Sequence, residues 1–170
     1  MKWVILLSLG MGVSLGGPPA KARAKVPTVS QAQLEVWLKS WQKRLALDDW
    51  EIGAQIVRSS DLRPDTLGNL KWNSATKKAT VRVLNPLDYD LPAKEIPIDI
   101  EYTVVHELIH LQLAALPRDP ANKNIEEKVV NRISEALFAL DKGASYRPRT
   151  EVIRMATKEK TSSEASRVKQ

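Results

Sequence analysis

The two histidines of this 170-residue chain are the residues whose spacing most directly suggests chemistry. Both lie in the segment TVVHELIHLQL, where His106 and His110 are four positions apart and Glu107 follows the first of them. In a helix, side chains at positions i and i+4 lie on one face a turn apart, so both imidazoles can reach one cation. Glu107 would then be placed to take a proton from a water molecule at that ion. The H-E-x-x-H spacing therefore predicts a metal site with a general base.

Chance is a poor explanation of this spacing. Shuffling the composition would place the two histidines four apart, with a glutamate after the first, in roughly 0.1% of arrangements. The neighbouring residues are apolar and indicate a buried helix, in which histidine nitrogens without partners would be costly. We therefore interpret His106 and His110 as metal ligands.

A third ligand must come from another part of the chain, because a catalytic zinc ion typically has three protein ligands and a water molecule. The chain has no cysteine and no further histidine, which leaves a carboxylate. The next predicted helix offers Glu126, Glu127 and Glu135. Glu127 also fits a capping box with Asn124, in which it would only hydrogen-bond to the start of the helix.

The two segments together resemble small zinc metallopeptidases of the gluzincin type, in which H-E-x-x-H is followed by a glutamate ligand on the next helix. The stretch E-x-x-V-N-x-I-S, starting at Glu127, is similar to E-x-x-A-N-x-F-A in the minigluzincin-like and phage-repressor-cleaving groups. This resemblance implies a zincin-like fold in which His106, His110 and Glu127 bind Zn²⁺. The need for a carboxylate ligand leaves Glu126, or another group, as the alternative to Glu127. In the wider family an acid four residues after the ligand orients the first histidine. Asn131 holds that position here and could accept the same N–H bond through its carbonyl.

Hydrophobic periodicity predicts the elements that position these residues. Ser30 and Gln33 form a capping box before a first helix, whose core-facing side is Leu34, Trp37, Leu38, Trp41 and Leu45. Alternating apolar residues predict a strand within 50–60 and two more around the turn 73–78. A helix from 98 or 99 to about 115 carries the histidines. The last helix, from 125 to about 140, has one apolar face made of Val129, Val130, Ile133, Ala136, Leu137 and Leu140. This order predicts an α+β domain with an N-terminal helix, a small antiparallel sheet, the H-E-x-x-H helix and a second ligand-bearing helix.

The two ends of the chain differ in composition from its middle. Residues 1–24 have an early lysine, an apolar stretch and an A-x-A-like end at Ala24, and predict a signal peptide for export to a periplasm or out of the cell. Residues 25–141 form the predicted metallopeptidase domain, with 15 basic and 17 acidic residues. Residues 142–170 form a basic tail that we expect to be disordered and able to contact an anionic envelope.

This distribution excludes several classes of function. The net charge of +6 belongs to the ends, so no basic surface for nucleic acid is predicted on the domain. No apolar run is long enough to span a membrane after signal cleavage. The absence of cysteine rules out disulfides, thiolate metal sites and a cysteine nucleophile.

These features together predict an exported zinc-dependent metallopeptidase that acts on a peptide or protein substrate, with Glu107 as catalytic base. An extended substrate could pair with strand 78–84 if that strand lies at the edge of the sheet. The candidates for stabilising the oxyanion beyond the metal are Tyr102, Arg132, Tyr146 and Arg147. One alternative is a zinc-stabilised, catalytically weak domain that binds a partner or the envelope, which would survive Glu107→Gln. Hydrolysis of a non-peptide amide is another.

Overall fold

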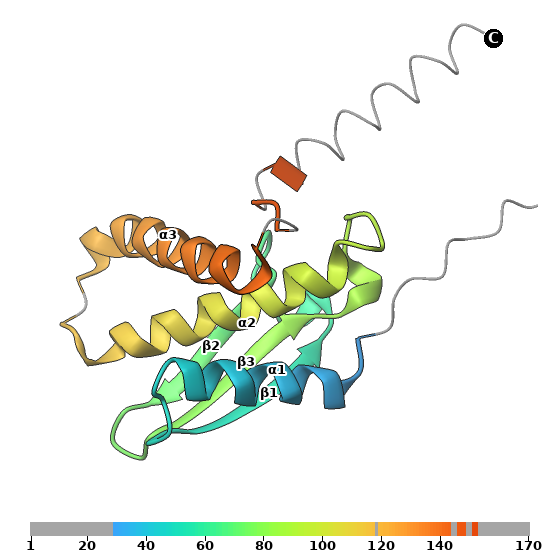
Figure 1. Cartoon of the computed structure of the whole chain (residues 1–170). Helices are drawn as coiled ribbons and strands as arrows, with labels where there is room; N and C mark the ends of the chain where they lie inside the picture. The colour runs from blue at the N-terminus through green and yellow to red at the C-terminus, as the bar shows by residue number, and fades with distance from the viewer. Residues whose placement is uncertain (1–28, 118, 144–145, 149–150, 153–170) are drawn as a thin grey trace, which may run out of the picture.

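The computed structural model describes residues 29–117, 119–143, 146–148 and 151–152 (Figure 1). Within them the helices and strands follow the order α1 (Gln31–Arg44), β1 (Glu51–Val57), β2 (Gly68–Asn73), β3 (Lys78–Leu84), α2 (Ile96–Gln112) and α3 (Lys123–Lys142). Short 3-10 turns lie between them, namely η1 (Ser59–Asp61), η2 (Pro86–Asp88), η3 (Leu113–Ala115) and η4 (Pro120–Asn122). The α+β class is confirmed. The predicted signal peptide and most of the predicted tail lie outside the described residues.

The strands form one mixed sheet in the order β1-β3-β2 (Figure 1). β2 and β3 pair antiparallel, as their hairpin predicts. β1 pairs parallel with β3, so the prediction of an antiparallel sheet is wrong for this strand. The connection 58–67 places β2 one strand away from β1. β3, which follows β2 in the sequence, then lies between them. Alternation of apolar residues identifies a strand but does not say which strand it pairs with.

β3 is therefore the central strand, so 78–84 is not the edge strand that was considered for substrate pairing. Its apolar residues Val81 and Val83 are fully buried against the helices. The two edges of the sheet are β1 and β2. A substrate that pairs with this sheet would have to do so at one of these edges.

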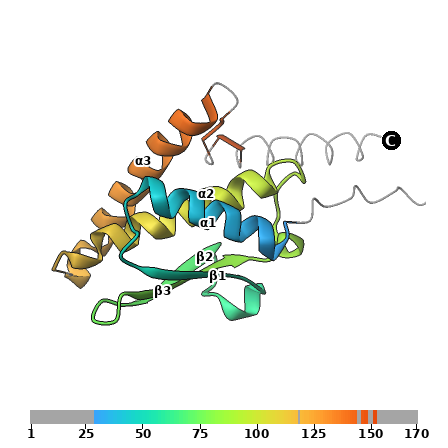
Figure 2. The same ribbon diagram turned by 60° about the horizontal axis from the view of Figure 1, so that its bottom comes forward.

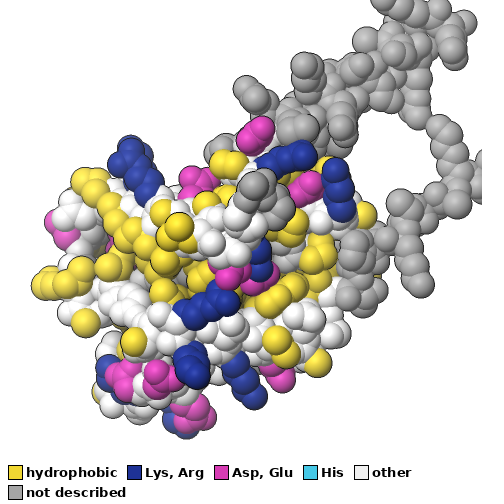
Figure 3. Space-filling view, in the orientation of Figure 1, with side chains coloured by type: hydrophobic (Ala, Val, Ile, Leu, Met, Phe, Trp, Pro, Cys, Tyr) yellow, Lys and Arg dark blue, Asp and Glu magenta, His cyan; other side chains and the backbone are white. Residues whose placement is uncertain are grey.

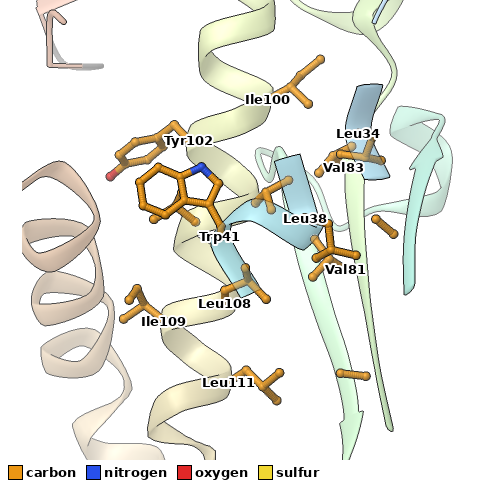
Figure 4. Packing of buried hydrophobic residues seen from close by; sticks show 14 of the residues in the cluster. Leu34, Leu38, Trp41, Val81, Val83, Ile100, Tyr102, Leu108, Ile109 and Leu111 are labelled. Atoms are coloured by element: carbon orange, nitrogen blue, oxygen red, sulfur yellow. The ribbon is translucent and has the colours of Figure 1, made fainter. Parts of the chain in front are cut away.

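The helices cover one face of the sheet (Figure 2). α1 packs on β1, and α2 packs on β2 and β3. Leu34, Leu38 and Trp41 of α1 are buried, as the helical period predicts, and Trp37 is partly buried. Figure 4 shows Leu34, Leu38 and Trp41 among the side chains of β3 and α2. The predicted cap is present, because Ser30 Oγ accepts a hydrogen bond from the Gln33 N–H at 3.1 Å.

α2 is the central helix, and 12 of its 17 residues are buried. It lies in contact with α1, α3 and the sheet, which explains why its sequence is apolar on nearly every side. Pro97 stands in its first turn, where a missing N–H costs no hydrogen bond. In the described part of the chain, no helix combines the length and the apolar character needed to cross a membrane.

α3 packs on α2 through a different face from the predicted one. Its fully buried residues are Val130, Ser134 and Phe138. Val129 and Ile133, which were expected in the core, are 40% and 39% exposed, and hydrophobic side chains are visible along this helix in Figure 3. The reason is that α3 has apolar residues on two adjacent faces, and Phe138 fixes which one is buried. Its ring lies 6.1 Å from that of Trp41 and 5.7 Å from that of Tyr102.

The start of α3 also differs from the prediction. The helix begins at Lys123 with Asn122 as N-cap, so Asn124 lies inside it. The expected capping box of Asn124 and Glu127 is therefore wrong. Glu127 stands in the second turn of the helix, where its side chain is available for another role.

The packed structure continues beyond residue 141. α3 includes Lys142, whose ammonium contacts the carboxylate of the buried Glu101 at 2.8 Å. The same carboxylate accepts a hydrogen bond from Trp41 Nε1 at 3.0 Å. Partial burial lowers the pKa of Lys142, but the carboxylates of Glu101 and Asp141 outweigh this and raise it overall. Tyr146 packs edge-on against Phe138, with 5.2 Å between ring centroids.

Candidate metal centre

The three predicted ligands come together where the second turn of α3 meets the C-terminal half of α2. His106 and His110 lie on the α2 face that is turned toward this turn, and both are partly buried. Their Nε2 atoms are 3.2 Å apart. The Glu127 carboxylate lies 3.6 Å from His106 Nε2 and 3.4 Å from His110 Nε2. One donor atom from each of the three residues therefore points to a common centre.

These separations fit a metal ion. Donor atoms placed 2.0–2.1 Å from a tetrahedral ion lie about 3.3 Å from one another. The two imidazole nitrogens are 3.2 Å apart, and the two Glu127 oxygens lie 3.4 and 3.6 Å from them, Oε1 from His110 and Oε2 from His106. Two imidazole nitrogens and a carboxylate gain nothing from converging in this way unless a proton or a cation lies among them. The group His106, His110 and Glu127 can thus hold a metal ion with three protein donors.

Glu126 contacts the other nitrogen of His110, instead of joining the group. Its Oε1 lies 3.0 Å from His110 Nδ1. A carboxylate at this nitrogen accepts its proton, fixes the tautomer and leaves Nε2 free to bind an ion. The two adjacent glutamates therefore have different positions, one at the common centre and one behind a ligand. From the sequence, Glu126 was predicted only as an alternative ligand, and this role behind His110 was not foreseen.

Glu107 lies at the same place but is not one of the converging donors. Its side chain is 8% exposed, and no hydrogen bond or ion pair joins its carboxylate to any described residue. Burial, followed by the negative charge of Glu127, raises the pKa of Glu107 to about 8. A buried carboxyl without a protein partner is expensive, and such groups concentrate where they act on a ligand.

A cavity of about 820 Å³ opens beside this group. His106, Glu107 and His110 line it from α2, and Glu127 and Asn131 line it from α3. The opposite wall is formed by β2 and by residues 60–67. Glu107 and the three converging donors therefore face a space large enough for a peptide-sized ligand.

β2 comes close to the candidate metal centre at Gly68, a residue that was not singled out from the sequence. A Cβ atom on Gly68 would lie 2.5 Å from Thr103 Cγ2, 2.9 Å from the Arg82 carbonyl and 3.3 Å from Glu107 Oε1. Only a glycine lets the strand run this close to α2. An isolated glycine at the start of a strand pattern was a usable signal for close backbone approach.

The backbone of β2 also offers hydrogen-bonding groups at its outer edge. The Leu84 N–H donates to the Leu67 carbonyl at 2.8 Å, so residues 67, 69, 71 and 73 are the ones that bond to β3. The N–H and C=O groups of Gly68 and Leu70 consequently point away from β3. No further strand lies beyond β2 in the described part of the chain.

The four candidates for oxyanion stabilisation lie elsewhere. None of Tyr102, Arg132, Tyr146 and Arg147, all of them described, is among the residues that line the large cavity. The buried Tyr102 hydroxyl donates to the Asn131 carbonyl at 3.4 Å and so joins α2 to α3. Tyr146 and Arg147 line a separate cavity of about 240 Å³. Asn131 does line the large cavity, and its expected role in orienting His106 stays a prediction.

Comparison of the chain with protein-family models, with curated proteins and with solved structures found no match.

Proposed function

We propose that this chain is a zinc-dependent metallopeptidase of the small gluzincin type, exported by its N-terminal segment and acting on a peptide or protein substrate. The observation that carries this proposal is the position of Glu107. It is a buried carboxyl group with no partner among the described residues, and it faces a cavity next to three converging metal donors. A site that only stabilised the fold would gain nothing from such a group.

Zinc is the ion that suits these donors. Two imidazoles and one carboxylate form a common set in catalytic zinc sites, which keep a fourth position open. The cavity beside His106, His110 and Glu127 provides room for that position. Once bound, zinc would lower the pKa of a water molecule and polarise a substrate carbonyl.

The chain's own groups have distinct tasks in this proposal. Glu107, buried and facing the cavity, takes a proton from the attacking water and returns it to the leaving amine. Glu126 holds His110 in orientation through Nδ1. Burial of α2 keeps the first two ligands and the base fixed relative to one another.

An extended substrate would bind along β2. The edge groups of Gly68 and Leu70 can hydrogen-bond to a peptide backbone as a further strand would. Gly68 stands beside Glu107, so a peptide paired with this strand passes the base. β2 thus replaces strand 78–84 as the proposed substrate edge.

Metal content and hydrolysis test the proposal together. The full chain, purified without chelator, should contain about one zinc per chain, and His110→Ala and Glu127→Ala should lose it. Glu107→Gln should keep the zinc and lose hydrolysis of a fluorogenic peptide library, since general-base catalysis contributes about 10²- to 10⁴-fold. Retained zinc with no hydrolysis by the unaltered chain would instead support the zinc-stabilised binding domain.

A further inference from the structure

The cavity beside the metal centre is lined by cationic side chains, although the predicted domain as a whole is slightly acidic. Arg63, Lys71, Arg82 and Lys123 all line it. The domain at 25–141 has 15 basic and 17 acidic residues, a net charge of −2. The positive lining is therefore a local feature of this cavity.

Most of this positive charge is not neutralised by the protein. Elsewhere, ion pairs are formed by Arg44, Arg58, Lys77, Lys78, Lys94 and Lys142. Arg63, Lys71 and Lys123 form no ion pair with any described residue. Arg82 donates to neutral groups only, the side-chain oxygen of Asn69 at 2.9 Å and the backbone carbonyl of Asp61 at 2.5 Å.

The cations of the cavity lining outnumber its acidic groups, which are Asp61, Glu107 and Glu127. Glu127 is one of the three converging metal donors, and Glu107 is buried beside them. The Asp61 carboxylate accepts a hydrogen bond from the Arg58 N–H at 3.3 Å. A divalent ion at the centre would add further positive charge, so the cavity presents a positive field to any incoming ligand.

The register of the sheet places two of the cations beside a bound strand. Val81 and Val83 face the helices, so Arg82 lies on the outer face of the sheet. Asn69 is directly opposite Arg82, and Lys71 lies on the same face two residues further along β2. A peptide paired with the β2 edge would send alternate side chains to this outer face, next to Asn69 and Lys71.

We propose that the ligand bound along β2 is an acidic peptide segment, with Asp or Glu side chains on the outer face beside Lys71 and with Arg82 on the same face of the next strand. This inference rests on the proposed function and names its substrate class. Opposite charges on neighbouring strands attract, whereas like charges repel. Lysine or arginine at the same substrate positions would therefore be rejected.

Three fluorogenic peptide libraries would test this with the zinc-loaded full chain. They share one randomised neutral core, flanked by glutamates, by glutamines or by lysines. We expect kcat/KM to be highest with glutamate and lowest with lysine, with steps on the order of three- to tenfold. The preference should shrink between 0.05 and 0.5 M salt, because the screening length falls well below about 10 Å.

Lys71→Glu should reverse the order of the libraries. The matched control is Lys39→Glu, an exposed change on α1 outside the cavity, which should keep the order of the unaltered chain. Equal rates for the three libraries would overturn the inference while leaving the proposed function intact. An unchanged preference in Lys71→Glu would overturn it as well.

A binding measurement separates this inference from the peptidase itself. Zinc-loaded Glu107→Gln is titrated against fluorescently labelled versions of the same libraries, with anisotropy as the readout. If the unaltered chain cleaves nothing, the proposed function fails, yet tighter binding of glutamate peptides that Lys71→Glu abolishes would still support an acidic ligand. Tighter binding of a short single-stranded DNA than of the glutamate peptides would overturn the inference in favour of nucleic acid.

Discussion

Glu107 is a side chain whose burial is unfavourable for the fold, although the proposed function gives it a use. Burial and the nearby Glu127 raise its pKa from 4.5 to about 8. Between these values the folded protein holds a proton that the unfolded chain releases. The metal-free fold should therefore lose stability as pH rises from about 4.5 to 8, by roughly a few kcal/mol at 1.36 kcal/mol per pKa unit.

Glu107→Gln should remove this loss. We expect the variant, with chelator present, to unfold at a higher urea concentration than the unaltered chain at pH 8 and at a similar concentration at pH 5. Glutamine cannot ionise, so the penalty for a buried negative charge disappears. Glu135→Gln on α3, outside the cavity, is the control. A stability difference that is the same at both pH values would contradict this account.

The end of α1 is an element whose sequence does not match its backbone. Ala46 has φ = 48°, and the Ala46 and Leu47 N–H groups donate to the carbonyls of Lys43 and Gln42. This is a Schellman motif, which normally has glycine at the left-handed position. Ala46→Gly should raise the free energy of unfolding by about 0.5–1 kcal/mol. Ala139→Gly, at an exposed position away from the ends of α3, should lower the free energy of unfolding by about as much. A loss of stability in both variants in urea denaturation would contradict the assigned motif.

The elements were more predictable than their arrangement. The helix boundaries agree within about two or three residues, because capping and apolar periodicity are local signals. The H-E-x-x-H segment was equally predictable from the sequence, because both histidines lie on one helix. The approach of Gly68 to Glu107 and the second role of Glu126 depend on contacts between segments that are distant in the chain. The same is true of the order of the strands, which alternation does not specify.

The three helices are joined by one buried charge. Glu101 on α2 is 7% exposed and is bonded by Trp41 of α1 and Lys142 of α3. Lys142→Met should lower the free energy of unfolding by about 3 kcal/mol, because it removes a partner of a buried carboxylate. Glu101→Gln combined with Lys142→Met should recover part of this loss, measured by urea denaturation. Lys128→Met, on an exposed part of the same helix, is the control. Equal stability of Lys142→Met and Lys128→Met would contradict this role.

If the proposed site binds an ion, the division of its donors between α2 and α3 links metal uptake to the completion of folding. A chain whose last helix has not yet docked offers only two histidines, so strong retention of an ion requires α3 to be in place. Phe138 lies about 16 Å along α3 from Glu127, yet loosening its packing should weaken zinc affinity through this linkage. Occupancy of the proposed site would thus report on the docking of α3. In an exported chain, zinc would be acquired at the destination, after the last helix has closed over the first two ligands.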